Sequence, residues 1–204
     1  MSRDLVRNAS RPGGMNGTHT IPNILAEMED LHIKNSVLLA IDLPLISDNA
    51  GTWLKATADK PELICFGSVH PYAPRMARNL DRQLGMGARG IKVHPAIQLV
   101  RPDWGRCLQL YDRCGRRGLP IMFHCGPVGI EPRVGRYLSQ VRHYRRGIEQ
   151  CKGTTFVLGH SGALQLDVAL DLARRNENVY LELASQSLSG IKQILREGPT
   201  DRVL

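Results

Sequence analysis

The chain has 204 residues, 23% of them charged, and a formal net charge of +8 at neutral pH. This length corresponds to one ordinary domain that can bury a sizeable core. No stretch approaches the roughly 20 apolar residues of a membrane helix, and no nucleic-acid-binding motif accompanies the positive charge. We therefore expect a cytoplasmic protein whose partner is a small molecule rather than a membrane or a nucleic acid.

Two other features of the sequence predict the state of the cysteines and the extent of the folded domain. The five cysteines form no CxxC pair and are odd in number, which predicts reduced thiols rather than a disulfide framework. Residues 1–17 are polar and contain no apolar signal-peptide core, so we expect a disordered leader. Residues 18–204 are then expected to form one domain.

Helix and strand patterns alternate along this domain. Thr20 and Pro22 predict a helix start, followed by an apolar face of Ile24, Leu25, Met28 and Leu31. Short apolar runs bounded by turn residues predict buried parallel strands. These runs are Ser36–Ile41, Leu63–Val69, Ala88–His94, Leu119–His124, Thr154–His160 and Val179–Leu183. With helical periodicity between them and no GxGxxG motif, the pattern favours an α/β fold of TIM-barrel type.

Four of the seven histidines stand at the carboxyl ends of these runs, at positions 70, 94, 124 and 160. Active sites of α/β barrels lie at this end of the strands. His124 and His160 are one strand–helix unit apart, so both imidazoles can reach one site, and neutral imidazole is a good zinc ligand. His70 and His94 each precede a proline, and for both we favour a structural role. His19, His32 and His143 are expected at the surface.

Charged residues add candidates around the same site. Lys92 and His94 should point to the same side of their strand, since side chains alternate along a strand. Lys92 could neutralise a substrate carboxylate, carry a metal-bridging carbamate or pair with Glu182, which could instead orient a ligand histidine. Cys125 is either a ligand or nucleophile or, the interpretation we favour, a small buried residue. The arginines at positions 133, 136, 142, 145 and 146 form a solvated helix face or attract an anionic substrate to the mouth.

Four motifs then resemble the amidohydrolase superfamily, in the branch that contains carboxymuconate-semialdehyde and resorcylate decarboxylases. They are GIKVHP (Gly90–Pro95), LPIMFHCG (Leu119–Gly126), FVLGHSG (Phe156–Gly162) and NVYLELAS (Asn178–Ser185). The resemblance spans about Thr18 to Leu204 and implies a metal-dependent TIM barrel. It implies His124 as a metal ligand and His160 as a second ligand or its catalytic partner. Lys92 corresponds to a lysine at the end of a barrel strand.

The chain also departs from this family pattern at both ends. It contains no H-x-H pair, which relatives carry on their first strand, and Asp201 lies at the start rather than the end of the last predicted strand. A complete barrel needs about 250 residues. We therefore expect an incomplete barrel, truncated at both ends, whose exposed sheet edges could join two copies.

The resemblance implies a metal-dependent hydrolase that uses a metal-activated water on a small, possibly carboxylated substrate. In this hypothesis a divalent metal, zinc by expectation, binds His124 and His160, while His160 and Lys92 are catalytic. His94, Arg133 and Arg136 bind substrate, and Glu182 supports the site from behind. The alternatives are a non-oxidative decarboxylase on the same scaffold and a catalytically silent remnant.

Overall fold

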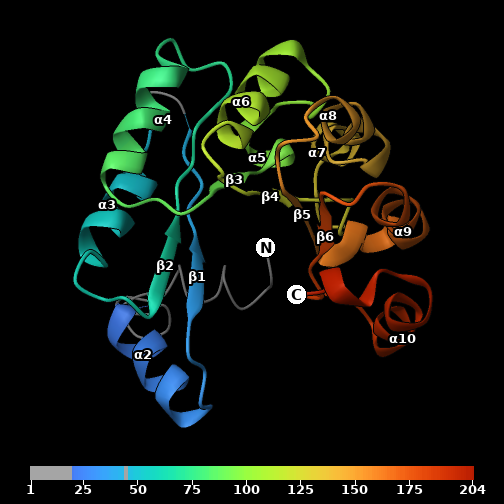
Figure 1. Ribbon diagram of the computed structural model, residues 1–204, viewed down its shortest axis with the longest axis horizontal. Coiled ribbons are helices and arrows are strands. Elements are labelled where there is room, and N and C mark those ends of the chain that lie inside the picture. The colour runs from blue at the N-terminus through green and yellow to red at the C-terminus, as the bar shows by residue number, and fades with distance from the viewer. Residues whose placement is uncertain (1–19, 44–45) are drawn as a thin grey trace.

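The computed structural model describes residues 20–43 and 46–204 (Figure 1). The predicted leader, 1–17, and His19 lie outside the described residues. The strands are β1 (Ser36–Leu39), β2 (Leu63–Phe66), β3 (Ile91–Val93), β4 (Ile121–His124), β5 (Phe156–Gly159) and β6 (Val179–Leu181). The α-helices are α2 (Ile21–Asp30), α3 (Asn49–Ala56), α4 (Met76–Gly85), α5 (Pro95–Gln98), α6 (Gly105–Gly115), α7 (Arg133–Leu138), α8 (Arg145–Gln150), α9 (Leu166–Arg175) and α10 (Leu188–Glu197). Short 3₁₀ helices are η1 (Val141–His143), η2 (His160–Gln165) and η3 (Thr200–Arg202).

All the described strands run parallel and follow one another in chain order. β1 pairs with β2, and β3 to β6 form a four-stranded sheet. A bridge between Gly67 and Ile91 links the two sheets, and a parallel bridge joins Leu181 to Val203. Figure 1 shows the helices outside a curved row of strands. The architecture is a partial TIM barrel, which confirms the predicted fold class.

The alternation of side chains along each strand separates core from site. Ile91, Ile121, Phe156 and Val179 are in register across the sheet and are completely buried against the helices. Lys92, Met122, Val157 and Tyr180 form the next row and point to the other face. This second face is the interior of the barrel, so the residues that do not pack against helices are the ones available to a ligand.

The predicted strands and first helix are present with shorter bounds. Thr20 caps α2 by accepting a hydrogen bond from the Asn23 N–H at 3.4 Å. The helix ends at Asp30, and Leu31, predicted on its apolar face, is instead the exposed C-cap. Near the carboxyl end, the segment predicted to open a strand forms η3 before Val203 bridges to β6. No helix in the described ranges is long and apolar enough to cross a membrane.

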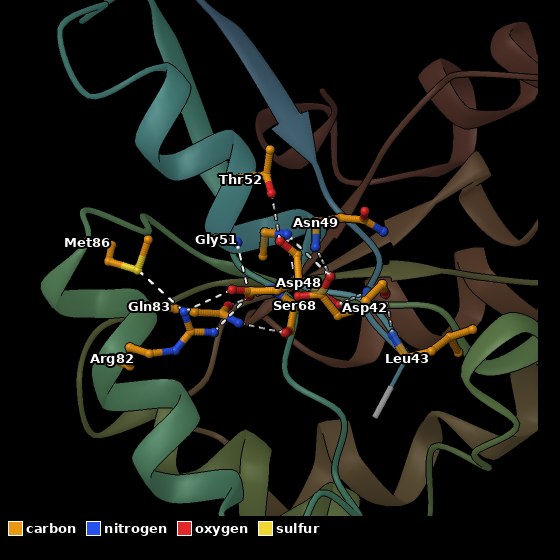
Figure 2. Close-up of polar contacts among 12 residues, drawn as sticks. Asp42, Leu43, Asp48, Asn49, Gly51, Thr52, Ser68, Arg82, Gln83 and Met86 are labelled. Atoms are coloured by element: carbon orange, nitrogen blue, oxygen red, sulfur yellow. Dashed lines mark hydrogen bonds and ion pairs between the residues drawn. The ribbon is translucent and has the colours of Figure 1, made fainter. Parts of the chain in front are cut away.

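A buried polar network, which we call the strand-end brace, joins the carboxyl ends of β1, β2 and β3. Its members are Asp42, Ser68, Gln83 and Gln98. The Asp42 N–H donates to Ser68 Oγ at 2.8 Å. The side-chain amide of Gln83 accepts from the Ser68 N–H and donates to the Ser68 carbonyl (Figure 2). Gln98 Nε2 donates to Asp42 O and to Ser68 Oγ at 3.1 and 3.3 Å. Gln98 Oε1 accepts from the His94 N–H at 2.9 Å, so the brace reaches the site described next.

Candidate active site

Three of the strand-end histidines form a contiguous row of imidazole rings. His94 and His124 stack with a centroid distance of 4.0 Å and an interplanar angle of 7°. His124 and His160 meet edge to face, with centroids 5.0 Å apart. The pairing of β3 with β4 and of β4 with β5 produces this row, because each histidine ends or follows its strand. The juxtaposition of His124 and His160 that the sequence predicts is therefore present.

Burial keeps two of these rings uncharged. Desolvation, followed by repulsion from neighbouring cationic groups, lowers the pKa of His94 to about 3 and that of His124 to about 4. Both rings are neutral at physiological pH. Neutral imidazole is the form that binds metals and accepts protons.

The backbone of His124 is hydrogen-bonded to Tyr144, and its ring lies near Glu131. Its backbone carbonyl accepts a hydrogen bond from Tyr144 Oη at 2.5 Å. Its Nε2 atom is buried without a hydrogen bond and lies 3.5 Å from Glu131 Oε1. Sequence reasoning missed Glu131, although it lies only seven residues beyond His124 in the loop that a barrel would use for its site.

The carboxylate of Glu131 is fixed by its own loop. It accepts hydrogen bonds from the N–H groups of Val128 at 2.7 Å and Gly129 at 2.9 Å. Burial would raise the pKa of Glu131, but these hydrogen bonds and the neighbouring His124 lower it overall. The site thus contains an ionised carboxylate next to an unpaired imidazole nitrogen.

His160 opens a turn with unusual backbone geometry. His160, Ser161 and Ala163 all have positive φ angles, of 59°, 44° and 49°, a region that residues other than glycine seldom adopt. Contacts from the segment after β6 hold this turn. The His160 N–H donates to Glu182 Oε2 at 2.8 Å, and Gln186 Nε2 donates to the His160 carbonyl at 2.6 Å. Non-glycine residues in such conformations are concentrated at functional sites.

Lys92 points into the barrel interior and forms no hydrogen bond or ion pair with any residue in the described ranges. Only 6% of the residue is exposed. It lines a cavity of about 380 Å³ together with His160, Glu182 and mainly apolar residues: Val37, Leu39, Phe66, Met122, Val157, Ala184 and Leu204. Burial lowers the pKa of Lys92 to about 8, and the more distant charge of Glu182 opposes this shift.

The pairing of Lys92 with Glu182, one of the alternatives for Lys92, is not formed, and Glu182 bonds other groups. Its two oxygens accept from the N–H groups of His160 and Ala184, at 2.8 and 2.5 Å. Its Oε2 also lies 3.8 Å from His160 Nδ1. Glu182 therefore holds the turn that carries His160, and none of the described carboxylates forms an ion pair with the Lys92 ammonium.

A metal centre is only partly provided by the described residues. The buried, unbonded Nε2 of His124 fits a metal ligand, and His160 Nδ1 contacts the Ala184 carbonyl at 3.1 Å, which leaves its Nε2 available. Among residues 20–43 and 46–204, however, no three His, Cys, Asp or Glu side chains are grouped to hold an ion. Two imidazoles alone do not complete a zinc centre.

Other predicted residues lie away from the Lys92 cavity. Arg133 and Arg136 are exposed on α7, and Arg136 contacts the Gly129 carbonyl at 3.5 Å. His70 is bonded through Nε2 to the Gln98 carbonyl at 2.8 Å, within the brace region. The buried thiol of Cys125 has a strongly raised pKa, which makes it a poor nucleophile.

The surface prediction for His143 is wrong. Only 7% of this residue is exposed, and its ring packs edge to face on Tyr137 with a centroid distance of 5.1 Å. The arginine-rich segment folds back on the barrel as α7, η1 and α8, which buries one face of it. The charged residues of this segment did not indicate in the sequence that one of its faces is buried. His32 is exposed, as predicted.

A parallel α/β barrel section with histidines, a lysine and carboxylates at the carboxyl ends of its strands defines a class of barrel enzymes. A family model described as amidohydrolase matches residues 22–204. The chain therefore belongs to this amidohydrolase family. A search of curated protein sequences found no significant match.

Solved structures support the fold. An uncharacterised TIM-barrel protein from Bordetella bronchiseptica is 18% identical, with a TM-score of 0.79 over 99% of this chain and 76% of that one. A dihydroxybenzoic acid decarboxylase from Polaromonas, with bound manganese and 2-nitroresorcinol, is 15% identical, with a TM-score of 0.69 over 100% and 78%. A probable 2-pyrone-4,6-dicarboxylic acid hydrolase from Acinetobacter baumannii is 12% identical, with a TM-score of 0.64 over 91% and 72%. At these identities the likeness shows the fold, and both decarboxylases and hydrolases share it.

Proposed function

We propose that the chain binds a small, largely apolar carboxylic acid beside Lys92 and catalyses its non-oxidative decarboxylation. The observation that carries this proposal is the buried Lys92 ammonium, which has no hydrogen bond or ion pair with residues 20–43 or 46–204 and lines a cavity with mainly apolar walls. A substrate carboxylate supplies the missing counter-ion, and the apolar walls accept the carbon skeleton. A volume of about 380 Å³ lies at the small end of the range for ligand pockets.

Lys92 also fits the proton donor that this reaction needs. Loss of CO₂ breaks a carbon–carbon bond, and the carbon left behind must receive one proton. The Lys92 ammonium can donate that proton, because burial already favours its neutral form and brings its pKa near 8. His160 and Glu182 line the same cavity and can return a proton to the amine. The net change is one carboxylate and one proton converted to CO₂ and the shortened product.

In this proposal the remaining predicted residues attract the anionic substrate or bind a metal ion. Arg133 and Arg136 lie outside the cavity and would act only by attracting an anion from a distance. A divalent metal, zinc by expectation and manganese in one structural relative, would bind His124 and His160. Such an ion would supply Lewis acidity when bound, and the Lys92 step is assigned independently of it.

Hydrolysis is the second candidate, because His124 has a buried, unbonded Nε2 atom near the ionised Glu131. This pair could accept a proton from a water molecule. A hydrolase would convert a lactone or similar ester without forming CO₂. The products of the two reactions therefore separate the candidates.

The test is an assay of the full chain against a panel of carboxylated phenols and lactones, with and without added zinc or manganese. We expect CO₂ release from a carboxylated phenol and incorporation of one solvent deuterium at the vacated carbon. The Lys92→Met variant should lose at least about 100-fold in kcat, whereas Lys55→Met, at an exposed lysine of α3, should not change it. Ring opening without CO₂ would identify a hydrolase, and inactivity on both substrate types would support the silent remnant.

A further inference from the structure

Lys92 has properties that suit a second kind of chemistry. Its amine is buried, its surroundings are largely apolar, and it has no hydrogen bond or ion pair with the described residues. A lysine amine desolvated in an apolar pocket becomes a nucleophile toward carbonyl compounds. This reactivity follows from the cavity and does not require the proposed decarboxylation.

We propose that Lys92 is a covalent capture site for small apolar or aromatic aldehydes, which it binds as an imine. The neutral Nζ atom attacks the carbonyl carbon and forms a C–N bond as the C=O π bond breaks, and one of the two N–H protons is transferred to the carbonyl oxygen. The resulting carbinolamine then loses this hydroxyl group as water, and the nitrogen gives up its remaining proton. One amine and one aldehyde thus become one imine and one water molecule, with no change of oxidation state.

The proton transfers in this sequence can be carried by groups that line the same cavity. His160 and Glu182 both belong to its wall. Glu182 keeps its backbone hydrogen bonds to His160 and Ala184, so its charge does not hold Lys92 in an ion pair. A carboxylate and an imidazole in the wall of the cavity are groups of the kind that act as general acid and base in carbinolamine dehydration.

Part of the cavity wall is exposed in the part of the chain that the structure describes. Val37, Leu39 and Leu204 belong to this wall and are 49%, 38% and 62% exposed. An aldehyde would reach Lys92 past these side chains. Phe66, Met122 and Val157 provide apolar contacts deeper inside, which favours an aromatic or alkyl aldehyde over a sugar.

The lowered pKa of Lys92, about 8, is consistent with this role. At pH 7.5 a much larger fraction of this amine is neutral than of an ordinary lysine. Attraction by the Glu182 carboxylate favours the charged form, and burial outweighs it. Lys92 lies two residues before His94, whose buried ring is neutral at this pH.

The experiment incubates the full chain with benzaldehyde and sodium cyanoborohydride at pH 7.5, which converts any imine to a stable benzylamine. Peptide mass mapping then measures the rate at which each lysine is modified. We expect Lys92 to react about tenfold faster than the exposed Lys55 and Lys192. The intact mass of Lys92→Met should show one fewer rapidly formed adduct.

Modification of Lys92 at or below the rate of Lys55 would overturn the proposal. Because the rates are mapped on the unmodified chain, the result does not depend on the folding of a variant. The decarboxylase assay on the same preparation separates the two ideas. Imine capture without CO₂ release would leave the further inference standing and reject the proposed function, and the converse result would do the opposite.

Discussion

At the scale of single residues, Lys92 is 6% exposed and has no hydrogen bond or ion pair with the described residues. A buried ammonium without a partner is destabilising, because burial removes its hydration and no carboxylate replaces it. Glu182, which lines the same cavity, accepts hydrogen bonds from the backbone N–H groups of His160 and Ala184 instead. Residues that oppose stability in this way are expected where function requires them.

We predict that Lys92→Met increases the free energy of unfolding at pH 7. A pKa lowered from 10.5 to about 8 corresponds to an upper limit of about 3 kcal/mol at 1.36 kcal/mol per unit. Between pH 8 and 10.5 the unfolded chain binds this proton and the folded chain does not, so the wild type gains stability as pH rises. The advantage of Lys92→Met should therefore be complete below pH 8 and disappear toward pH 10.5.

Urea unfolding of both proteins at pH 7, 8.5 and 10 measures this difference. Lys55→Met serves as the control and should match the wild type at each pH, since Lys55 is exposed. A Lys92→Met protein less stable than the wild type at pH 7 would show that Lys92 has a partner outside the described residues.

At the scale of elements, the strand ends are held by buried side-chain amides. Gln98 is 2% exposed and connects the ends of β1, β2 and β3 through its hydrogen bonds to Asp42, Ser68 and His94. Backbone pairing between β2 and β3 ends with the bridge of Gly67 to Ile91 and the bond from the Lys92 N–H to the Gly67 carbonyl, so the segments beyond this point depend on side chains. The brace therefore contributes to the position of the first ring in the imidazole row.

We predict that Gln98→Leu destabilises the protein by about 2–3 kcal/mol, because it leaves buried backbone and hydroxyl groups without partners. Gln193→Leu is the matched control, since Gln193 bonds Asp167 and Glu197 on the surface of α10 and α9. Its cost should stay below about 0.5 kcal/mol. Equal unfolding midpoints in urea for the two variants would show that the brace does not stabilise the fold.

The turns after β4 and β5 meet at two glycines. Gly126 has a φ of +81°, and a Cβ atom there would lie 1.9 Å from the Gly162 carbonyl oxygen. This close approach of two backbones sets the spacing between the turn after His124 and the part of η2 that contains Gly162. A side chain at this position cannot be accommodated by a rotamer change, because the obstacle is backbone.

We predict that Gly126→Ala lowers the free energy of unfolding by more than about 3 kcal/mol. Gly153→Ala is the control, because its Cβ would meet no atom within 4 Å and its φ is not in the left-handed region. That substitution should be neutral or slightly stabilising. Thermal unfolding of both variants checks the prediction, and a Gly126→Ala protein as stable as Gly153→Ala would contradict it.

At the scale of the whole molecule, the partial barrel places two potential metal ligands together without a third among the described residues. We predict that zinc or manganese raises the Tm of the wild type only at high metal concentration, since stabilisation depends on the ratio of ligand concentration to Kd. His124→Ala/His160→Ala should lose this effect. Metal content after dialysis gives an independent readout, and a stoichiometric ion retained by the wild type would show that further ligands complete the site.

Much of this architecture follows from local pattern. Buried parallel strands are apolar on both faces, so runs such as Leu119–His124 and Thr154–His160 stand out in the sequence, although the structure shortens them to β4 and β5. The meeting of His124 and His160 follows from the same reasoning, because neighbouring parallel strands end at the same edge. Glu131, Gln98 and the burial of His143 were not predicted, since each depends on how a loop or short helix folds back.

The sequence by itself determined the α/β barrel class, the family and the strand ends that carry the site, because repeated hydrophobic patterns encode these features locally. Only the tertiary structure decided which charges meet. It directed Glu182 to the backbone of the His160 turn, left Lys92 without an ion pair among the described residues and placed Glu131 near His124. Electrostatic and hydrogen-bond partners depend on distances of a few ångströms between segments far apart in the chain, and residue patterns alone do not specify those distances.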